Sequence, residues 1–188
     1  MSCLHRTIVL AFICLLLFGG CSKYSDEVHA NLTKLKETKS CSGCDLCGIE
    51  LISFDLKGAD LSGANLTGAN LKRSDLTGAN LTDTNLTDAD LLGVNLTGAT
   101  LTNTNLSGVK LSYSNINEVD ISGAVLKHAH MNSSKVVNSK IRNSDMTGAN
   151  LYNADLTDTK VSKETLKNAV LCKTIMPSGQ QDDSGCKR

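Results

Sequence analysis

The sequence predicts an all-β fold, a parallel β-helix whose coils have four sides, and three observations lead to it. First, every fifth residue from Leu46 to Leu171 is apolar, which makes 26 consecutive positions, 19 of them Leu. Second, the residue two places earlier is nearly always small, and Asp or Asn directly precedes the apolar residue at 16 of these positions. Third, Gly recurs two places after it, so the repeating unit is Ala-(Asp/Asn)-Leu-x-x.

A period of five fits neither an α-helix nor a straight strand. Five residues advance about 500° around an α-helix, so the leucines would spiral over its whole surface. In a straight strand, an odd period would send successive leucines to opposite faces. The chain must therefore turn once in every unit. The Leu and the small residue then point inward, the other three residues point outward, and four units close a coil.

The turns and the stacking account for the rest of the pattern. Gly, Asn and Asp adopt the backbone conformations that tight corners require. Stacked coils are separated by about 4.8 Å, so about six coils make a rod roughly 30 Å long. Each buried Leu contributes roughly 2 kcal/mol before conformational entropy is counted. Because the end coils expose unpaired backbone groups, we expect a cap at each end.

The charge balance excludes some classes of partner. The 188 residues include 19 Lys plus Arg and 19 Asp plus Glu, so the net charge does not favour nucleic acid. The charges are uneven along the predicted column, however. Residues 44–108 contain eight acids and three bases, whereas residues 109–173 contain six acids and nine bases. The two halves of the column therefore differ in sign.

Several outward residues, among them Val137, depart from the repeat. The position directly after the Leu is normally Thr or Ser, but larger apolar residues stand there in a few units. With 20 residues in a coil, Ile52, Leu92 and Tyr152 share one side, and Tyr113 lies on that side one coil beyond Leu92. We interpret these four residues as a candidate contact face. The alternative is ordinary scatter, because isolated apolar residues are common on protein surfaces.

The repeat run from Cys44 to Lys173 resembles the pentapeptide-repeat family. This resemblance implies a right-handed quadrilateral β-helix of about six coils and leaves the function open. The cysteine-containing flanks on both sides of the run are similar to the ends of exported family members. Residues 162–169 are expected to form a short helix that caps the last coil, since Glu164 stands where a small inward residue would be.

The N-terminus resembles the signal peptide of bacterial lipoproteins. His5 and Arg6 precede an apolar run over residues 8–18, which is too short to span a bilayer. Residues 17–21, Leu-Phe-Gly-Gly-Cys, are similar to a lipobox, which implies that Cys21 is the lipidated first residue of the mature protein. Two or more acyl chains would anchor it stably. The alternative is an ordinary signal peptide that is cut nearby.

The chain then divides into four segments. We predict a signal peptide over 1–20, a lipid-anchored polar tether or N-terminal cap over 21–40, the β-helix over 41–173, and a C-terminal cap or tail over 174–188. Within the second segment an apolar stripe with helical spacing leaves both a docking helix and a flexible linker open. The residues of this stripe are Val28, Leu32 and Leu35.

In an exported protein, disulfide bonds are the first expectation for cysteines. Cys172 and Cys186 would close a small loop and hold the C-terminal end of the column. Cys41, Cys44 and Cys47 imply one pair and one free thiol, most simply Cys41 with Cys44 or with Cys47.

A metal or iron–sulfur site is the alternative interpretation of Cys-x-x-Cys-x-x-Cys. The fourth Cys and the following Pro of a ferredoxin run are absent, and His29 is the only other ligand nearby. A second, weaker metal signal is the pair His128 and His130, which flank the inward Ala129 and should lie on the surface. We therefore predict no metal and no cofactor.

Nothing in the sequence predicts catalysis. It has no Ser/His/Asp arrangement, no phosphate-binding loop and no paired buried carboxylates, so we predict a protein that is not an enzyme and has no catalytic residues.

The leading functional hypothesis is a non-catalytic scaffold of the bacterial cell envelope, anchored by lipid on the periplasmic side. The resemblance to bacterial lipoproteins implies the outer membrane, because Ser22 and not Asp follows the lipidated Cys. The expected partners are the membrane, an envelope protein or glycan, and a second copy in a homodimer, but not nucleic acid.

Two alternatives come from other classes of function. Some pentapeptide-repeat proteins mimic DNA and protect DNA gyrase from quinolones. Mimicry of DNA requires a strongly negative surface, and the nearly neutral column argues against it. The second alternative is a thiol or metal-binding protein.

Overall fold

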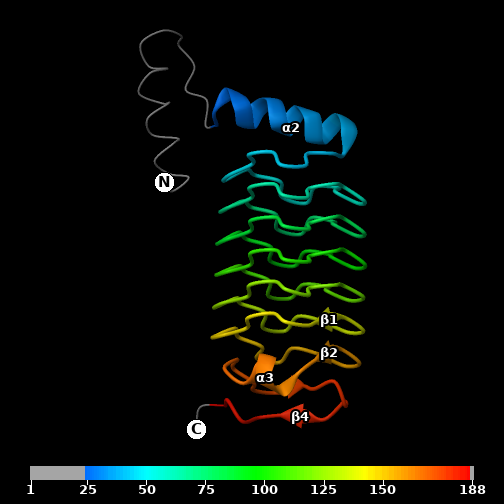
Figure 1. Ribbon diagram of the computed structural model, residues 1–188, viewed down its shortest axis with the longest axis vertical. Helices are drawn as coiled ribbons and strands as arrows, with labels where there is room; N and C mark the ends of the chain where they lie inside the picture. Colours follow the sequence, from blue (N-terminus) through cyan, green and yellow to red (C-terminus); the bar gives the residue numbers. More distant parts are fainter. Residues whose placement is uncertain (1–23, 187–188) are drawn as a thin grey trace.

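The computed structural model describes residues 24–186. Figure 1 shows them as a column of flat coils, with helix α2 at one end and strand β4 at the other. Parallel β-bridges join residues 20 positions apart, from Ser40 with Asp60 to Asp155 with Ile175. Four five-residue units therefore complete each coil, as the repeat predicts.

Regular strands are very short, because each side of a coil contributes a single bridging residue before the chain turns. The described part of the chain has four strands of two residues each. β1 (Lys140–Ile141) pairs in parallel with β2 (Lys160–Val161), and β3 (Thr174–Ile175) pairs antiparallel with β4 (Gln181–Asp182). Isolated parallel bridges make up the rest of the column.

Backbone hydrogen bonds join each coil to the next. The N–H of Leu46 donates to the carbonyl of Asn65 at 2.8 Å, and the N–H of Asn65 donates to the carbonyl of Cys44 at 2.8 Å. The same pattern recurs along the column. Because these bonds run between successive coils, the two end coils lack partners on one side and must be covered.

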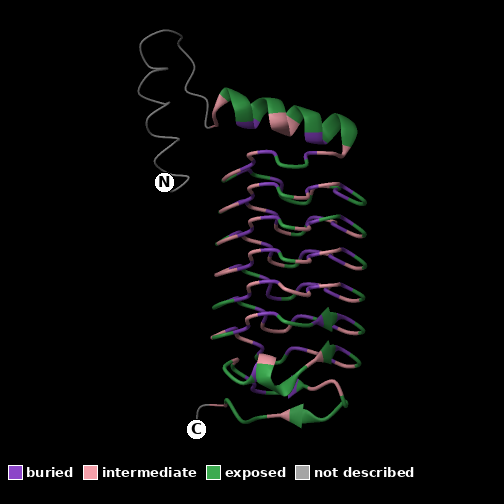
Figure 2. Cartoon of the chain, in the orientation of Figure 1, coloured by how far each residue is buried: buried purple, intermediate pink, exposed green. Residues whose placement is uncertain are grey.

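The core is a stack of inward side chains. From Leu46 to Leu156, every fifth residue is at most 2% exposed, and the small residues two places earlier are buried beside them. In Figure 2 the buried residues recur along every coil of the column, at the same places in successive coils. No coil could bury its own Leu ring, so neighbouring coils stabilise one another.

Hydroxyl residues replace Ala in the small inward position of several coils. There the hydroxyl donates to the carbonyl of the apolar residue 23 positions earlier, as Thr84 does to Leu61 at 2.8 Å and Thr104 to Leu81 at 2.7 Å. These bonds satisfy hydroxyl groups that would otherwise be buried without a partner. The repeat therefore accepts Ser or Thr in its core without leaving a polar group unpaired.

The corner of a unit lies two residues after the Leu and has a left-handed backbone, except at Lys163 and Asn168, where a short helix interrupts the column. Gly58 has a φ of 63°, and the same conformation is kept where a larger residue replaces Gly, as at Tyr113 with a φ of 59°. Glycine adopts this conformation without cost, whereas other residues adopt it with strain.

Helix α2 (Asp26–Thr38) covers the first coil, so the docking-helix alternative for residues 21–40 is confirmed over most of that segment. Ser25 caps its N-terminus by accepting a hydrogen bond from the N–H of Val28. Val28 and Leu35 are buried against the column. The amide of Asn31 donates to the carbonyl of Asp45 at 3.0 Å and thereby binds a backbone group of the first coil.

Helix α3 (Lys163–Leu166) forms within the predicted 162–169 helix, but it does not cap the last coil. Ser162 is its N-cap, and Glu164 points to solvent instead of into the core. Beyond the helix, Val170 again bridges to Asn150. The predicted role is therefore wrong, because the chain rejoins the ladder after α3 and leaves a further coil edge to be covered.

The β3–β4 hairpin covers that edge. The N–H of Gly185 donates to the carbonyl of Leu171 at 2.6 Å, and the N–H of Lys173 donates to the carboxylate of Asp183 at 2.9 Å. A Cβ on Gly185 would lie 2.8 Å from the backbone nitrogen of Leu171, so only glycine fits there.

Within residues 24–186, neither helix is long and apolar enough to span a bilayer.

Candidate contact face

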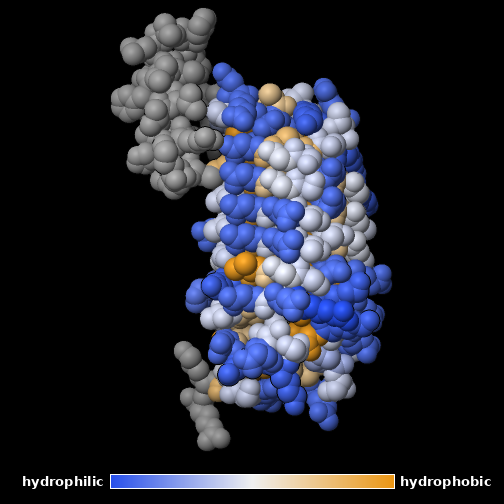
Figure 3. All heavy atoms as spheres, in the orientation of Figure 1, coloured by the Kyte–Doolittle hydropathy of each residue, from blue (hydrophilic) through white to orange (hydrophobic). Residues whose placement is uncertain are grey.

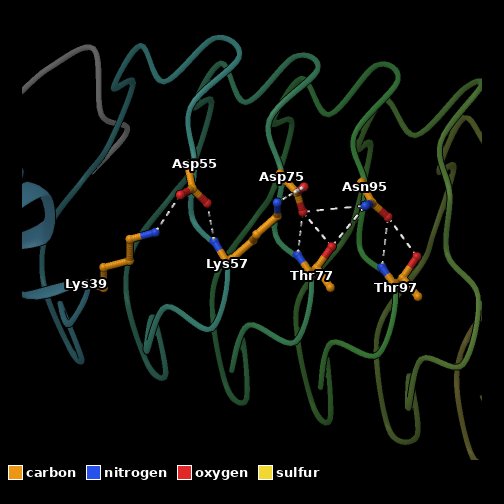
Figure 4. Close-up of polar contacts among 7 residues, drawn as sticks. All are labelled: Lys39, Asp55, Lys57, Asp75, Thr77, Asn95 and Thr97. Carbon is orange, nitrogen blue, oxygen red and sulfur yellow. Dashed lines mark hydrogen bonds and ion pairs between the residues drawn. The ribbon is translucent and has the colours of Figure 1, made fainter.

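The outward positions of the column form four lengthwise faces. On one of them, polar side chains of successive coils form hydrogen bonds with one another. We call this face the ladder face; it consists of the positions 55, 57 and 58 and their equivalents every 20 residues. Figure 4 shows its first part. The hydroxyl of Thr97 donates to Asn95 Oδ1 at 2.7 Å, and the amide of Asn95 donates to the hydroxyl of Thr77 at 2.9 Å.

Ion pairs extend the ladder towards α2. Lys39 Nζ lies 2.9 Å from Asp55, and Lys57 Nζ lies 3.2 Å from Asp75. The hydroxyl of Thr77 lowers the pKa of the Asp75 carboxyl, and the Lys39 ammonium lowers that of Asp55. The polar groups of this part of the ladder face are therefore engaged with one another.

The contact face is the neighbouring face, at the positions 50, 52 and 53 and their equivalents every 20 residues. The 20-residue coil places Ile52, Leu92 and Tyr152 in one lengthwise row, as predicted. Tyr113 lies at a corner of the same face. The exposed fractions are 51% for Ile52, 68% for Tyr113 and 41% for Tyr152, while Leu92 is half-buried.

A shallow hollow of about 300 Å³ surrounds Leu92. Asp90 is one of its lining residues, with Lys72 Nζ at 3.0 Å and Lys110 Nζ at 3.7 Å from the same carboxylate oxygen. The lining residues are Lys72, Asp90, Leu92, Lys110, Ser112 and His130. Two ammonium groups thus share one carboxylate beside an apolar side chain.

Sequence reasoning missed the lysines and His130 as members of this site. It sought outward residues that were unusually apolar, whereas these side chains are ordinary surface residues taken singly. The signal that could have identified them is the coil length. Lys72 and Ser112 stand one coil on either side of Leu92, and Asp90, Lys110 and His130 follow one another at intervals of 20.

The contact face is also the more positive of the two faces. It carries the acids Glu50 and Asp90 and four bases, a balance of +2. These bases are Lys72, Arg73, Lys110 and Lys173. The ladder face over the same coils carries five acids and two bases, a balance of −3. Its charged residues are Asp55, Asp75, Glu118, Asp155, Asp158, Lys57 and Lys135.

The cysteines form disulfides. Cys41 is bonded to Cys44, which is one of the two predicted pairings, and Cys172 is bonded to Cys186. Cys47 is disulfide-bonded as well, so the expected free thiol is not found among residues 24–186. The expectation of a free thiol was wrong, because it considered only pairings among Cys41, Cys44 and Cys47.

The disulfides also bear on metal binding. Cys172, Asp183 and Cys186 come within 4.8 Å of one another, but the two sulfurs bond each other and offer no thiolate. The same holds for the Cys-x-x-Cys-x-x-Cys segment, whose sulfurs are all in disulfides. His128 and His130 are exposed on different faces of the column. Cys21, the predicted lipid attachment site, lies outside the described residues.

A second hollow, of about 630 Å³, opens where α3 departs from the ladder. Val125 bridges to Asp145, but the bridge from Asp145 to Thr165 that the 20-residue spacing would continue is replaced by the helix. The rim includes Arg142, Lys160 and Glu164.

On the side that Figure 3 shows, hydrophobic side chains appear only at isolated places among hydrophilic ones.

Comparisons with known proteins agree with the repeat. The model of the family described as pentapeptide repeats (8 copies) matches four overlapping segments, residues 40–78, 55–93, 74–112 and 89–127. No curated protein matches the chain.

Several solved structures are similar. The pentapeptide repeat protein alr5209 from Nostoc PCC 7120 is 29% identical, covers 52% of this chain and 79% of its own, and has a TM-score of 0.47. A trypsin-treated variant of QnrB1, a plasmid-mediated fluoroquinolone resistance protein, is 16% identical over 78% of this chain and 80% of its own, with a TM-score of 0.45. A pentapeptide repeat protein from the thylakoid lumen of Arabidopsis thaliana is 26% identical over 78% and 79%, with a TM-score of 0.20.

The five-residue period, the 20-residue coil and the match to the family model lead to one conclusion. Residues 40–127 of this chain match the pentapeptide-repeat family.

Proposed function

We propose that this protein is a non-catalytic, lipid-anchored scaffold of the bacterial cell envelope, built on a right-handed quadrilateral β-helix, and that the contact face binds its partner. One observation carries the proposal. On the contact face, exposed aromatic and aliphatic side chains lie beside cations. In the first part of the ladder face, by contrast, the polar side chains form hydrogen bonds with one another.

The site has the features of a binding surface and lacks those of a catalytic one. Aromatic residues and Arg are enriched where proteins meet partners, and the contact face carries Tyr113, Tyr152 and Arg73. In the hollow around Leu92, the carboxylate of Asp90 is engaged by two lysines, with Lys72 Nζ at 3.0 Å and Lys110 Nζ at 3.7 Å. The contact face is therefore suited to holding a partner in place.

The anchor is supported by the lipobox-like residues 17–21. Ser25, the N-cap of α2, follows Cys21 by four positions, so a lipid on Cys21 would leave only a very short tether. Four residues span at most about 14 Å when fully extended. We propose that the column is held with its α2 end close to the membrane and its β3–β4 end away from it.

Metabolic labelling with a palmitate analogue tests the anchor. We expect label on the wild-type protein in the membrane fraction and loss of label in Cys21→Ala. Unlabelled wild-type protein in the cytoplasmic fraction would contradict the anchor and would reopen the gyrase-protection alternative.

Photo-crosslinking in cells tests the contact face. A crosslinking amino acid replaces Tyr113 in one variant and Glu118 in the other. Both positions are corners of the same coil with left-handed backbones, at φ of 59° and 60°, but Glu118 lies on the ladder face. We expect an adduct from position 113 only. Equal adducts from both positions, or none from either, would reject the contact face.

A further inference from the structure

We propose that the contact face binds a linear acidic polysaccharide lying along the column; this inference rests on the contact face being the working surface of the protein. The charge of the face is the first reason. Its balance of +2, beside −3 on the ladder face, favours an anionic occupant on this side of the column.

The hollow around Leu92 provides the local geometry. Lys72 and Lys110 come from coils on either side of Asp90 and share its carboxylate, so one positive charge is in excess. Both lysine side chains are substantially exposed, at 38% and 60%. An incoming carboxylate or sulfate could replace part of their pairing with Asp90 without being buried itself.

The tyrosines provide the second type of contact. Tyr113 and Tyr152 are exposed on the same face in different coils, and Lys173 Nζ lies 5.8 Å from the centre of the Tyr152 ring. The C–H groups of a sugar ring pack against aromatic rings, while the acidic groups of the polymer meet the lysines. Because coils are about 4.8 Å apart, two residues two coils apart are separated by roughly 10 Å along the column. Contacts of this kind suit an extended chain of rings.

The order of residues along the row favours a polysaccharide over a lipid surface or an apolar protein interface. Between Ile52 and Leu92 stands Lys72, and between Leu92 and Tyr152 stand Ser112 and Asn132. The apolar side chains are therefore separated by polar ones and form no continuous apolar patch of the kind that interface cores contain. Alternating polar groups and rings match a polymer with the same alternation.

Tyr113 is the more exposed of the two tyrosines of the contact face. This position is a left-handed corner where Gly stands in many other units, and a tyrosine there carries conformational strain. This corner carries a 68% exposed aromatic ring on the contact face. Glu118 on the ladder face has the same backbone conformation, so it is the exposed ring and not the strain that supports the proposal.

Affinity electrophoresis of the full chain in detergent micelles tests the proposal. Polygalacturonate is the acidic probe and dextran the neutral control, each cast into the gel. We expect retardation by polygalacturonate alone, lost in high salt because exposed charges are screened. Equal retardation by dextran, or no retardation by either polymer, would overturn the proposal. Binding to vesicles containing phosphatidylglycerol without binding to polygalacturonate would overturn it in favour of a membrane surface.

A matched pair of double variants locates the site. Lys72→Gln with Lys110→Gln is expected to weaken polygalacturonate binding about tenfold. Lys57→Gln with Lys127→Gln removes the same charge, and each of these lysines is likewise paired with an Asp, at 3.2 Å, but on other faces. This control should bind as the wild type does. Equal losses in both variants would show unspecific attraction and overturn the site.

Tyr113→Ser with Tyr152→Ser tests the stacking. We expect loss of retardation while thermal unfolding stays close to that of the wild type, because both side chains are on the surface. Wild-type retardation of this variant would overturn the role of the tyrosines. If polygalacturonate fails to bind while crosslinking at position 113 captures an envelope protein, the polysaccharide inference is wrong and the proposed scaffold function stands.

Discussion

The contact face and the ladder face are neighbouring sides of one column, yet they use their outward residues differently. On the ladder face Asp75, Thr77 and Asn95 bond to one another from coil to coil. On the contact face Leu92 and Tyr152 occupy the Thr position, so the corresponding hydroxyl bond is missing there. At Tyr152 the backbone cap remains, with the N–H of Tyr152 donating to Asn150 at 3.0 Å. Between Leu92 and Tyr152, one side-chain bond joins two coils, from the hydroxyl of Ser112 to Asn132 at 2.6 Å. The same repeat position therefore carries a hydroxyl that joins two coils at Thr77 and an apolar side chain at Leu92 and Tyr152.

The largest expected effect tests whether the difference is confined to the surface. Leu91→Ala beneath the contact face and Leu96→Ala beneath the ladder face remove equally buried side chains. We expect each to lower the free energy of unfolding by about 3 kcal/mol, since both leave a cavity. Urea unfolding measures both variants. A clear difference between the two losses in free energy of unfolding would show that the core is packed differently beneath the two faces.

The next effect removes one rung of the ladder. Thr77→Val is nearly isosteric but loses the hydroxyl that binds Asp75 and accepts from Asn95. We expect a loss of about 1 kcal/mol in the free energy of unfolding. Tyr152→Val on the contact face is the control and should change it by less than about 0.5 kcal/mol, because no hydroxyl rung is lost. Equal losses would remove the distinction between the two faces.

A smaller effect of opposite sign is expected at Tyr113. Tyr113→Gly removes the strain of a tyrosine in the left-handed conformation, which stabilises the folded state. It also raises the conformational entropy of the unfolded chain, which favours unfolding, but this effect is the smaller of the two. We expect the free energy of unfolding to rise by about 0.5 kcal/mol while crosslinking and polysaccharide binding through this face are weakened. Thermal unfolding together with affinity electrophoresis checks both parts. A destabilised variant would show that Tyr113 supports the fold instead of the function.

The smallest effect is the pH dependence of the ladder. The pKa of Asp75 is lowered in the folded state, chiefly by the Thr77 hydroxyl, so the unfolded chain binds more protons. The corresponding stability is present above the ordinary carboxyl pKa and is lost as the pH falls through the folded value. We therefore expect Thr77→Val to show a shallower loss of stability than the wild type between about pH 5 and pH 2. Parallel curves would rule out this contribution of Thr77.

Particular residues show how far the sequence could predict the molecule. The period of Leu46 and its successors predicted the inward column and the 20-residue coil. The apolar stripe of α2 left a docking helix and a flexible linker open, and the structure shows the helix. The helix around Glu164 was predicted, but its place was not, because the return of Val170 to the ladder depends on how α3 packs. The cluster around Asp90 was missed, because it joins single residues from successive coils that are unremarkable in the linear sequence.

The sequence by itself determined the column. A period of five residues allows only a chain that turns in every unit, and regularly spaced Leu and small residues allow only one inward side. The tertiary structure alone decided which outward side chains meet, which cysteine bonds to Cys41, and what covers the last coil. The physical reason is that a core repeat is a local rule obeyed in every unit. Contacts between coils and at an open end instead depend on the length of the whole turn and on how backbone groups without partners are satisfied.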